Sequence, residues 1–235
     1  MESLQIKGVM NTSLIDYPGN IVATVFFPRC NFRCPFCHNP ELVFDEVEKN
    51  IDPDEFFKFL KSRRKWLDGV CITGGEPTLQ PGLKDFIRKV KDMGMKVKLD
   101  TNGTNPGLVK ELIDEGLVDQ VAMDVKASLE NYLDVVKAKV DIDKIKECIS
   151  LLMEGRTDYV FRTTAVPKHF NEKEAHEIGK LIKGAKKYVI QQFRNTEKML
   201  EEEYHSIEPY LSGDLERFKK ILETYVDDVE IIGVT

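Results

Sequence analysis

A chain of 235 residues, 42% of them hydrophobic, can bury a core large enough for one α/β domain, which excludes global disorder. The net charge of −6 at pH 7 argues against a nucleic-acid-binding surface, which needs clustered basic residues. No apolar run approaches the ~18 residues that span a membrane, and the N-terminus lacks a signal-peptide pattern. We therefore expect a cytoplasmic protein that binds neither nucleic acid nor membrane.

Residues 1–20 form a preface to the predicted fold. A short strand is expected from Leu4 to Val9, and Asp16-Tyr17-Pro18-Gly19 is a turn sequence. The β-branched and aromatic residues from Ile21 to Phe27 then predict a buried strand. This strand runs directly into a segment rich in cysteine.

That segment is Cys30-x3-Cys34-x2-Cys37, with three of the five cysteines within eight residues. In a reducing compartment, clustered cysteines are ligands or catalysts rather than disulfides. Thiolates hold soft metal centres and iron–sulfur clusters, and three ligands on a four-iron cluster leave one iron open. Zinc, with His38 or a distant histidine as fourth ligand, is the alternative. His38 adjoins Cys37 and does not easily join the same tetrahedron.

The rest of the chain alternates strands with helices. Further strands are expected at residues 69–73, 95–99, 119–123, 159–166, 188–193 and 229–234, and helices at about 53–66, 83–94, 105–116, 142–152, 171–181 and 215–225. Six βα repeats imply an α/β fold with a parallel sheet that curves into a partial (β/α)6 barrel. No linker divides the chain, so we expect one domain over 1–235, with an acidic, irregular C-terminal extension beginning at residue 194.

Polar clusters follow the carboxyl ends of successive predicted strands. After the cysteine segment come Gly74-Gly75-Glu76-Pro77, Asp100-Thr101-Asn102-Gly103 and Asp124-Val125-Lys126. Sites in parallel α/β barrels lie at this face, so the clusters predict one pocket. A bare glycine backbone admits a ligand while Glu76 faces an amine, and Lys126 suits hydroxyls or a carboxylate. Locally, the glycine pair also fits a tight turn, and the Asp100 cluster fits a turn that satisfies its own amides.

The cysteine spacing, with Phe36 before the last cysteine, resembles the motif of the radical S-adenosylmethionine (radical SAM) superfamily, and Gly74-Gly75-Glu76-Pro77 resembles its second signature. The resemblance covers nearly the whole chain. It implies that Cys30, Cys34 and Cys37 hold one [4Fe–4S] cluster. It also implies that S-adenosylmethionine chelates the fourth iron and is cleaved by one electron to a 5′-deoxyadenosyl radical.

A finer resemblance is to glycyl-radical-enzyme activating proteins, such as those of anaerobic ribonucleoside-triphosphate reductase and pyruvate formate-lyase. It is carried by Asp16-Tyr17-Pro18-Gly19, Cys37-His38-Asn39-Pro40 and the Asp100 and Asp124 clusters. It implies an oxidoreductase that abstracts a glycine hydrogen from a partner glycyl radical enzyme. Residues 38–73 contain only Cys71, so further clusters are not expected. The single cluster then needs an external electron donor such as flavodoxin or ferredoxin.

The resemblance also assigns cofactor-binding residues. It places Phe36 and His38 in the adenosyl pocket, and it places Gly74, Gly75 and Glu76 at the methionyl amine. It places Asp100 and Thr101 near the methionyl carboxylate, with room for a monovalent cation beside them. It places Asp124 and Lys126 in contact with the ribose or the carboxylate. Two more assignments come from later strands, Arg162 and Gln192.

Two other functions stay open at this level. A radical enzyme that acts on a small molecule, similar to 7-carboxy-7-deazaguanine synthase, shares the cysteine spacing and the Gly-Gly-Glu-Pro signature. A zinc-binding or electron-transfer protein without catalysis shares only the cysteines. Formation of 5′-deoxyadenosine would exclude the protein without catalysis. Turnover without a protein partner would favour the enzyme that acts on a small molecule.

Overall fold

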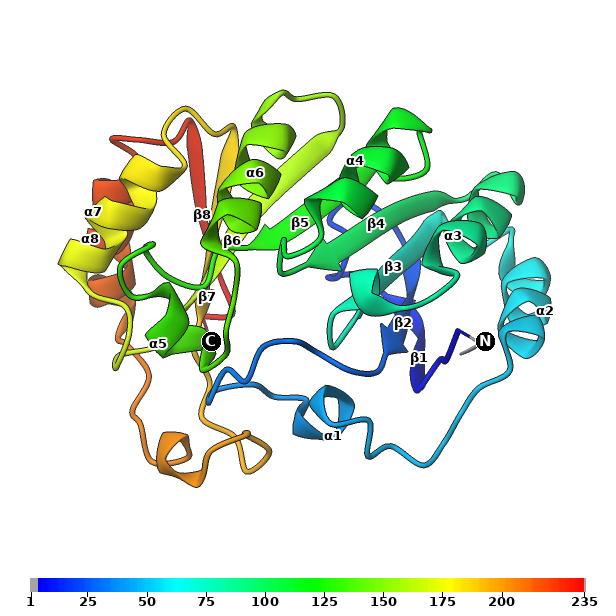
Figure 1. Ribbon diagram of the computed structural model, residues 1–235, viewed down its shortest axis with the longest axis horizontal. Helices are drawn as coiled ribbons and strands as arrows, with labels where there is room; N and C mark the ends of the chain where they lie inside the picture. Colours follow the sequence, from blue (N-terminus) through cyan, green and yellow to red (C-terminus); the bar gives the residue numbers. More distant parts are fainter. Residues whose placement is uncertain (1–3, 235) are drawn as a thin grey trace.

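The computed structural model describes residues 4–234, so the outermost ends of the domain expected over 1–235 lie outside the described residues. Its strands form one eight-stranded sheet in which spatial order follows chain order from β1 to β8 (Figure 1). The expected α/β fold with a curved, mostly parallel sheet is confirmed.

The strands are β1 (Gly8–Ser13), β2 (Val22–Phe27), β3 (Gly69–Gly74), β4 (Lys96–Thr101), β5 (Gln120–Asp124), β6 (Asp158–Ala165), β7 (Lys187–Gln192) and β8 (Asp228–Ile232). Every neighbouring pair from β2 to β8 is parallel, and β1 pairs with β2 in the antiparallel sense. The predicted strand at 4–9 was placed too early, because the pairing with β2 begins at Gly8 and continues to Ser13.

The helices are α1 (Pro40–Val43), α2 (Pro53–Arg63), α3 (Leu83–Asp92), α4 (Pro106–Asp114), α5 (Tyr132–Val136), α6 (Ile142–Met153), α7 (Glu172–Leu181) and α8 (Ser212–Leu222). Asp52, Asn105 and Asn171 begin α2, α4 and α7, and each side chain accepts a hydrogen bond from a first-turn amide. The short α1 and α5 were not predicted, because so few residues carry no helical stripe. Within residues 4–234, no helix has the length and apolar character to cross a membrane.

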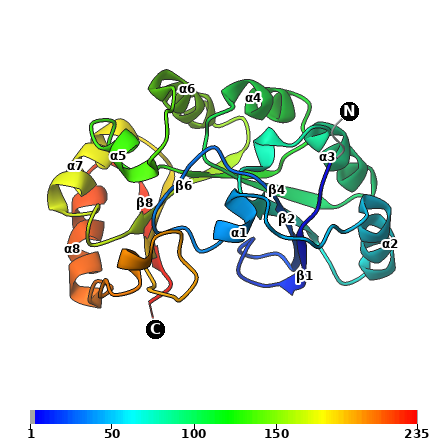
Figure 2. The same cartoon turned by 60° about the horizontal axis from the view of Figure 1, so that its bottom comes forward.

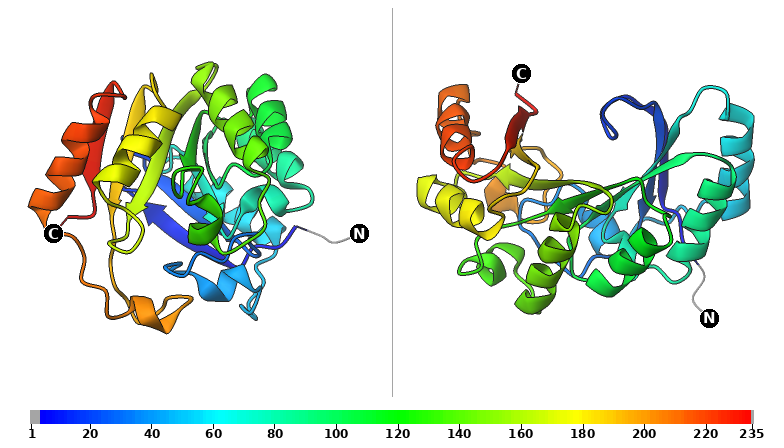
Figure 3. Two further views of the ribbon diagram at one scale, coloured as in Figure 1. Left: turned by 60° about the vertical axis from the view of Figure 1, so that its left-hand side comes forward. Right: turned by 90° about the horizontal axis from the view of Figure 1, so that it is seen from above.

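The sheet bends so that the longer helices cover its convex face while β1 and β8 form the two edges of the open side (Figure 3). Successive residues of a strand point to opposite faces. In β4, Val97 and Leu99 belong to the large core shared with the helices. Lys98 and Asp100 therefore point to the concave face. The polar side chains of this face are the ones that can meet a ligand.

The cysteine segment crosses the carboxyl ends of the strands, beside residues 194–211, which we call the C-terminal strap (Figure 2). The two are joined by hydrogen bonds: the Glu201 amide donates to the Pro35 carbonyl at 3.0 Å, and His38 Nε2 lies 3.0 Å from the Arg194 carbonyl. Most of the strap is irregular, as predicted, apart from one 3-10 turn, Glu202–Tyr204. It holds the cysteine segment from the open side of the sheet.

Candidate cofactor site

A cavity of about 260 Å³ opens where the strands end at their carboxyl termini. All the site residues predicted from the sequence line it, with the exception of Gln192. The Gln192 side chain instead donates to the Tyr210 carbonyl at 2.8 Å. Its neighbour Gln191 takes the place on the wall, because adjacent residues of a strand face opposite sides.

The three cysteines share one short loop that turns back on itself. The Cys37 amide donates to the Cys34 carbonyl at 3.0 Å, and the Phe32 amide donates to Cys30 Sγ at 3.4 Å. Burial raises the pKa of the Cys30 thiol to about 11 and that of Cys34 to about 12, while the positive charge of Lys126 opposes the shift at both. Because iron binds the thiolate, loading this loop must displace those protons.

The donor set is one that an iron–sulfur cluster can use. Three sulfurs on one loop line the same cavity, as cluster ligation requires. Across residues 4–234, no three His, Cys, Asp or Glu side chains are grouped to hold one metal ion.

Two glycines let the turn after β3 lie flush against the start of the cysteine segment. The Gly75 amide donates to the Phe27 carbonyl at 2.8 Å, and the Glu76 amide donates to the Arg29 carbonyl at 2.7 Å. A Cβ on Gly74 would overlap the Phe27 backbone, and a Cβ on Gly75 would overlap the Arg29 carbonyl. Gly74 also has φ = +128°, which side-chain-bearing residues rarely adopt. The bare backbone of this turn forms part of the cavity wall.

Glu76 is buried, with 1% of its surface exposed, and its carboxylate is fully engaged within the protein. It accepts hydrogen bonds from the amide and hydroxyl of Thr78 at 3.0 and 2.6 Å, from Thr101 Oγ1 at 2.8 Å and from the Asn102 amide at 2.6 Å. Burial raises the pKa of this carboxyl, and these hydrogen bonds oppose the shift. The side chain therefore joins the loops after β3 and β4, in addition to lining the cavity.

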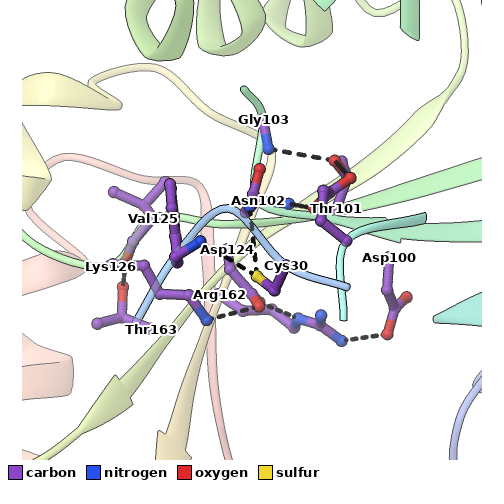
Figure 4. A network of polar contacts seen from close by, with 12 residues as sticks. Cys30, Asp100, Thr101, Asn102, Gly103, Asp124, Val125, Lys126, Arg162 and Thr163 are labelled. Carbon is purple, nitrogen blue, oxygen red and sulfur yellow. Dashed lines mark hydrogen bonds and ion pairs between the residues drawn. The ribbon is translucent and has the colours of Figure 1, made fainter. Parts of the chain in front are cut away.

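Five charged side chains on the concave face form a continuous chain of ion pairs, which we call the charge ladder: Lys98, Asp100, Arg162, Asp124 and Lys126. Lys98 pairs with one Asp100 oxygen, and Arg162 Nη1 lies 2.9 Å from the other. Arg162 Nε lies 2.8 Å from Asp124, whose second oxygen lies 2.9 Å from Lys126 Nζ (Figure 4). Burial acts to raise the pKa of Asp124, but Arg162 and Lys126 outweigh it and hold that pKa at about 2.

On the side of the cysteine segment, the cavity wall is aromatic. The buried Phe36 ring lies 6.1 Å from the His169 ring and 6.4 Å from the Tyr204 ring of the C-terminal strap. His169 Nε2 and Tyr204 Oη are 2.6 Å apart, and their rings stack. No sequence pattern indicated Tyr204 or His169, because neither belongs to one of the strand-end clusters.

The cavity thus offers three thiols on one wall, an apolar ring, a bare backbone turn and four of the five charge-ladder side chains. With Lys98 behind the wall, the ladder has one more cation than carboxylates. These surfaces complement a ligand that carries a flat apolar ring at one end and a carboxylate with an amine at the other. Thr164 and Gln191, next to the ladder on β6 and β7, complete the wall.

Comparison with known proteins agrees with this geometry. A model of the Radical SAM superfamily matches residues 24–182, more than half of the chain. A protein of Methanocaldococcus jannaschii, whose name assigns it as a glycyl-radical enzyme activating enzyme, is 35% identical over 231 residues, covering 96% of this chain and 95% of that protein. Pyruvate formate-lyase-activating enzyme of Clostridium pasteurianum is 30% identical over 234 residues, covering 96% and 90%.

A solved structure agrees on the fold. Streptococcus suis SuiB bound to S-adenosylmethionine superposes with a TM-score of 0.67 over 89% of this chain, at 14% identity. The matched region is 52% of the SuiB chain, so this protein spans about half of that enzyme's length. At this identity the likeness concerns the fold alone.

Proposed function

Because the chain belongs to the radical SAM superfamily, we propose that this radical SAM enzyme activates a glycyl radical enzyme, specifically an anaerobic ribonucleoside-triphosphate reductase. The observation that supports this most is the convergence of the cysteine loop, the glycine turn and the charge ladder on one cavity. Two relatives matched over nearly their whole length are named as activating enzymes, which supports the activase class over other radical chemistry.

In this proposal Cys30, Cys34 and Cys37 hold one [4Fe–4S] cluster, and S-adenosylmethionine lies across the strand ends. Bound together, the cluster and S-adenosylmethionine supply a one-electron cleavage of the sulfonium that yields a 5′-deoxyadenosyl radical able to take a hydrogen atom. The protein contributes binding and orientation, and no general acid–base pair is needed.

Each wall of the cavity has a task in this scheme. Phe36 and His38 face the adenosyl group, and the hydrogen bond of His38 to the Arg194 carbonyl fixes the imidazole. The Gly74 and Gly75 backbone lies at the methionyl amine, and Glu76 holds that turn against Thr101. The charge ladder faces the methionyl carboxylate and the ribose. A monovalent cation beside Asp100 and Thr101 would compete there with Arg162, which already pairs with Asp100.

The proposed partners follow from the chemistry. The hydrogen donor is a glycine of the partner enzyme, and the electron donor is an external flavodoxin or ferredoxin, since residues 38–73 hold no second cysteine group. The cytoplasmic location, and the absence of a nucleic-acid or membrane partner, stay predictions from composition.

The decisive experiment is anaerobic reconstitution followed by mixing with the candidate reductase. We expect S-adenosylmethionine to change the electron paramagnetic resonance spectrum of the reduced cluster, 5′-deoxyadenosine to form, and a glycyl radical doublet to appear on the partner. Cys30→Ala should lose the cluster, whereas Cys148→Ala, which removes a buried thiol on α6, should keep it. Deoxyadenosine without a doublet on any glycyl radical enzyme would favour a small-molecule substrate, and no deoxyadenosine at all would refute the enzyme.

A further inference from the structure

We propose that Arg162, braced through Asp100 by Lys98, is the built-in counter-charge of this site, so that S-adenosylmethionine binds without a bound monovalent cation. The inference rests on the cofactor part of the proposed function and not on the identity of the partner. It concerns the place beside Asp100 and Thr101, where the resemblance of the sequence left room for such a cation.

The strand register puts the arginine between the two carboxylates. Asp124 of β5 pairs directly with Arg162 of β6, and Asp100 of β4 pairs with Ala122, two residues before Asp124. The two carboxylates therefore share the concave face on adjacent strands, and the long arginine side chain reaches both from the third. One guanidinium bonds both, through Nη1 at 2.9 Å and Nε at 2.8 Å.

Every carboxylate oxygen of the charge ladder already has a cationic partner. Asp100 Oδ1 pairs with Lys98 and Oδ2 with Arg162, while Asp124 Oδ1 pairs with Arg162 and Oδ2 with Lys126. All five side chains are mostly buried, with exposed fractions from 4% for Lys98 to 23% for Asp124. An alkali ion needs several oxygen ligands, and here it would have to displace a held guanidinium from a fork that matches carboxylate geometry.

The charge ladder can neutralise the methionyl carboxylate without a further ion. Lys98, Arg162 and Lys126 carry three positive charges, and Asp100 and Asp124 carry two negative ones. The methionyl carboxylate would bring the sum to zero. Without Arg162 the same group would be one positive charge short, which is the deficit that a monovalent cation fills. Uncompensated charge in such a site is costly, so the deficit would weaken binding.

Lys98 is a positioning residue in this scheme. Its side chain is 4% exposed and does not line the cavity, whereas Asp100 and Arg162 do. Its ammonium group pairs with Asp100 Oδ1, and this contact orients the carboxylate so that Oδ2 pairs with Arg162. Losing Lys98 should therefore disturb ligand binding only through Asp100.

The wild-type protein alone provides the first test. After anaerobic reconstitution, the dissociation constant for S-adenosylmethionine is measured by titration calorimetry in potassium, sodium and tetramethylammonium chloride at equal ionic strength. We expect the three values to agree within about twofold, since screening is the same and no alkali ion takes part. Weakening by about tenfold or more in tetramethylammonium would overturn the proposal.

The same titrations on variants then test whether the Arg162 guanidinium supplies the counter-charge. Arg162→Gln should bind at least about tenfold more weakly in tetramethylammonium and recover much of this in potassium or sodium, because an alkali ion can enter the vacated place. Arg162→Lys should stay independent of the cation, and Lys98→Gln should show a smaller dependence than Arg162→Gln. The matched control is Arg156→Gln, which removes an arginine paired with Asp114 and Glu154 on the outer surface and should behave like wild type.

If Arg162→Gln bound with wild-type affinity in every salt, the guanidinium would not be the counter-charge and the proposal would fail. If that variant did not fold, the wild-type salt series would still decide. Failure of the partner reductase to form a glycyl radical would refute the activase but leave the salt series unchanged, so the two proposals fail separately.

Discussion

Replacing Glu76 by glutamine tests whether its carboxylate joins the loops after β3 and β4. One carboxylate oxygen accepts three hydrogen bonds, from Thr78 and Thr101, and the other accepts one from the Asn102 amide. A glutamine oxygen can take over the three-donor position. Its NH2 group then faces the Asn102 N–H, so a buried donor meets another donor.

The expected cost follows from that one mismatch. A buried backbone N–H without an acceptor costs ~1–3 kcal/mol, and the neutral amide regains part of the desolvation that raises the carboxyl pKa. We therefore expect Glu76→Gln to lower the free energy of unfolding by about 1–2 kcal/mol. Glu76→Ala loses all four bonds and leaves a void, so about 3–5 kcal/mol is expected, a large part of the ~5–15 kcal/mol of a typical domain.

The assay is urea unfolding of the metal-free protein under reducing, anaerobic conditions, with the slopes of the variants compared to confirm one transition. Glu115→Gln is the control, because Glu115 forms ion pairs with Lys84 and Arg88 on the surface and its loss should leave the midpoint unchanged. If both Glu76 variants also unfolded at the wild-type midpoint, the claim that this carboxylate cross-links the two loops would be refuted.

Three further outcomes are expected. The Asp124 pKa of about 2, against an ordinary 3.8, contributes about 2 kcal/mol that is present above pH 4 and lost as pH falls towards 2. Asp124→Asn should therefore be less stable at pH 7, and in acid titrations its deficit should shrink below pH 4. Gly75→Ala should reduce iron incorporation and cost at least ~1 kcal/mol, whereas Gly213→Ala, with open space around it on α8, should cost nothing. Tyr204→Phe should lose about 1 kcal/mol with its hydrogen bond to His169 but keep wild-type iron content; a loss of iron would contradict a purely packing role.

Strand positions were predictable because most of the parallel strands contain a short buried apolar run that is followed by a polar or glycine-rich cluster. The run from Ile21 to Phe27 became β2 from Val22, and the run starting at Gly69 became β3 with one residue more. The polar and glycine-rich clusters also located the candidate site, because the carboxyl ends of parallel strands lie at the same edge of the sheet. The family comparison and the cavity agree with that part of the reasoning.

What the sequence did not reveal depends on which face a residue takes and on distant contacts. Gln192 was assigned from the resemblance alone, and which of two adjacent glutamines faces the cavity depends on the strand register. Lys98 was not predicted as a site residue. A lysine beside an apolar residue in a strand is typical of the solvent-exposed face, whereas Lys98 is part of a buried ion pair. Tyr204 sits in an acidic, irregular stretch, and its contact with Phe36 joins residues too distant for any local pattern to record.

The C-terminal strap has a consequence for how the site is assembled during synthesis. The three cysteines leave the ribosome well before Tyr204 and the Glu201 amide, which hold their loop. A nascent chain that ends after β7 therefore carries all the cluster ligands on a loop that the C-terminal strap does not yet cover. The iron site can take its final closed form only after the strap has been synthesised.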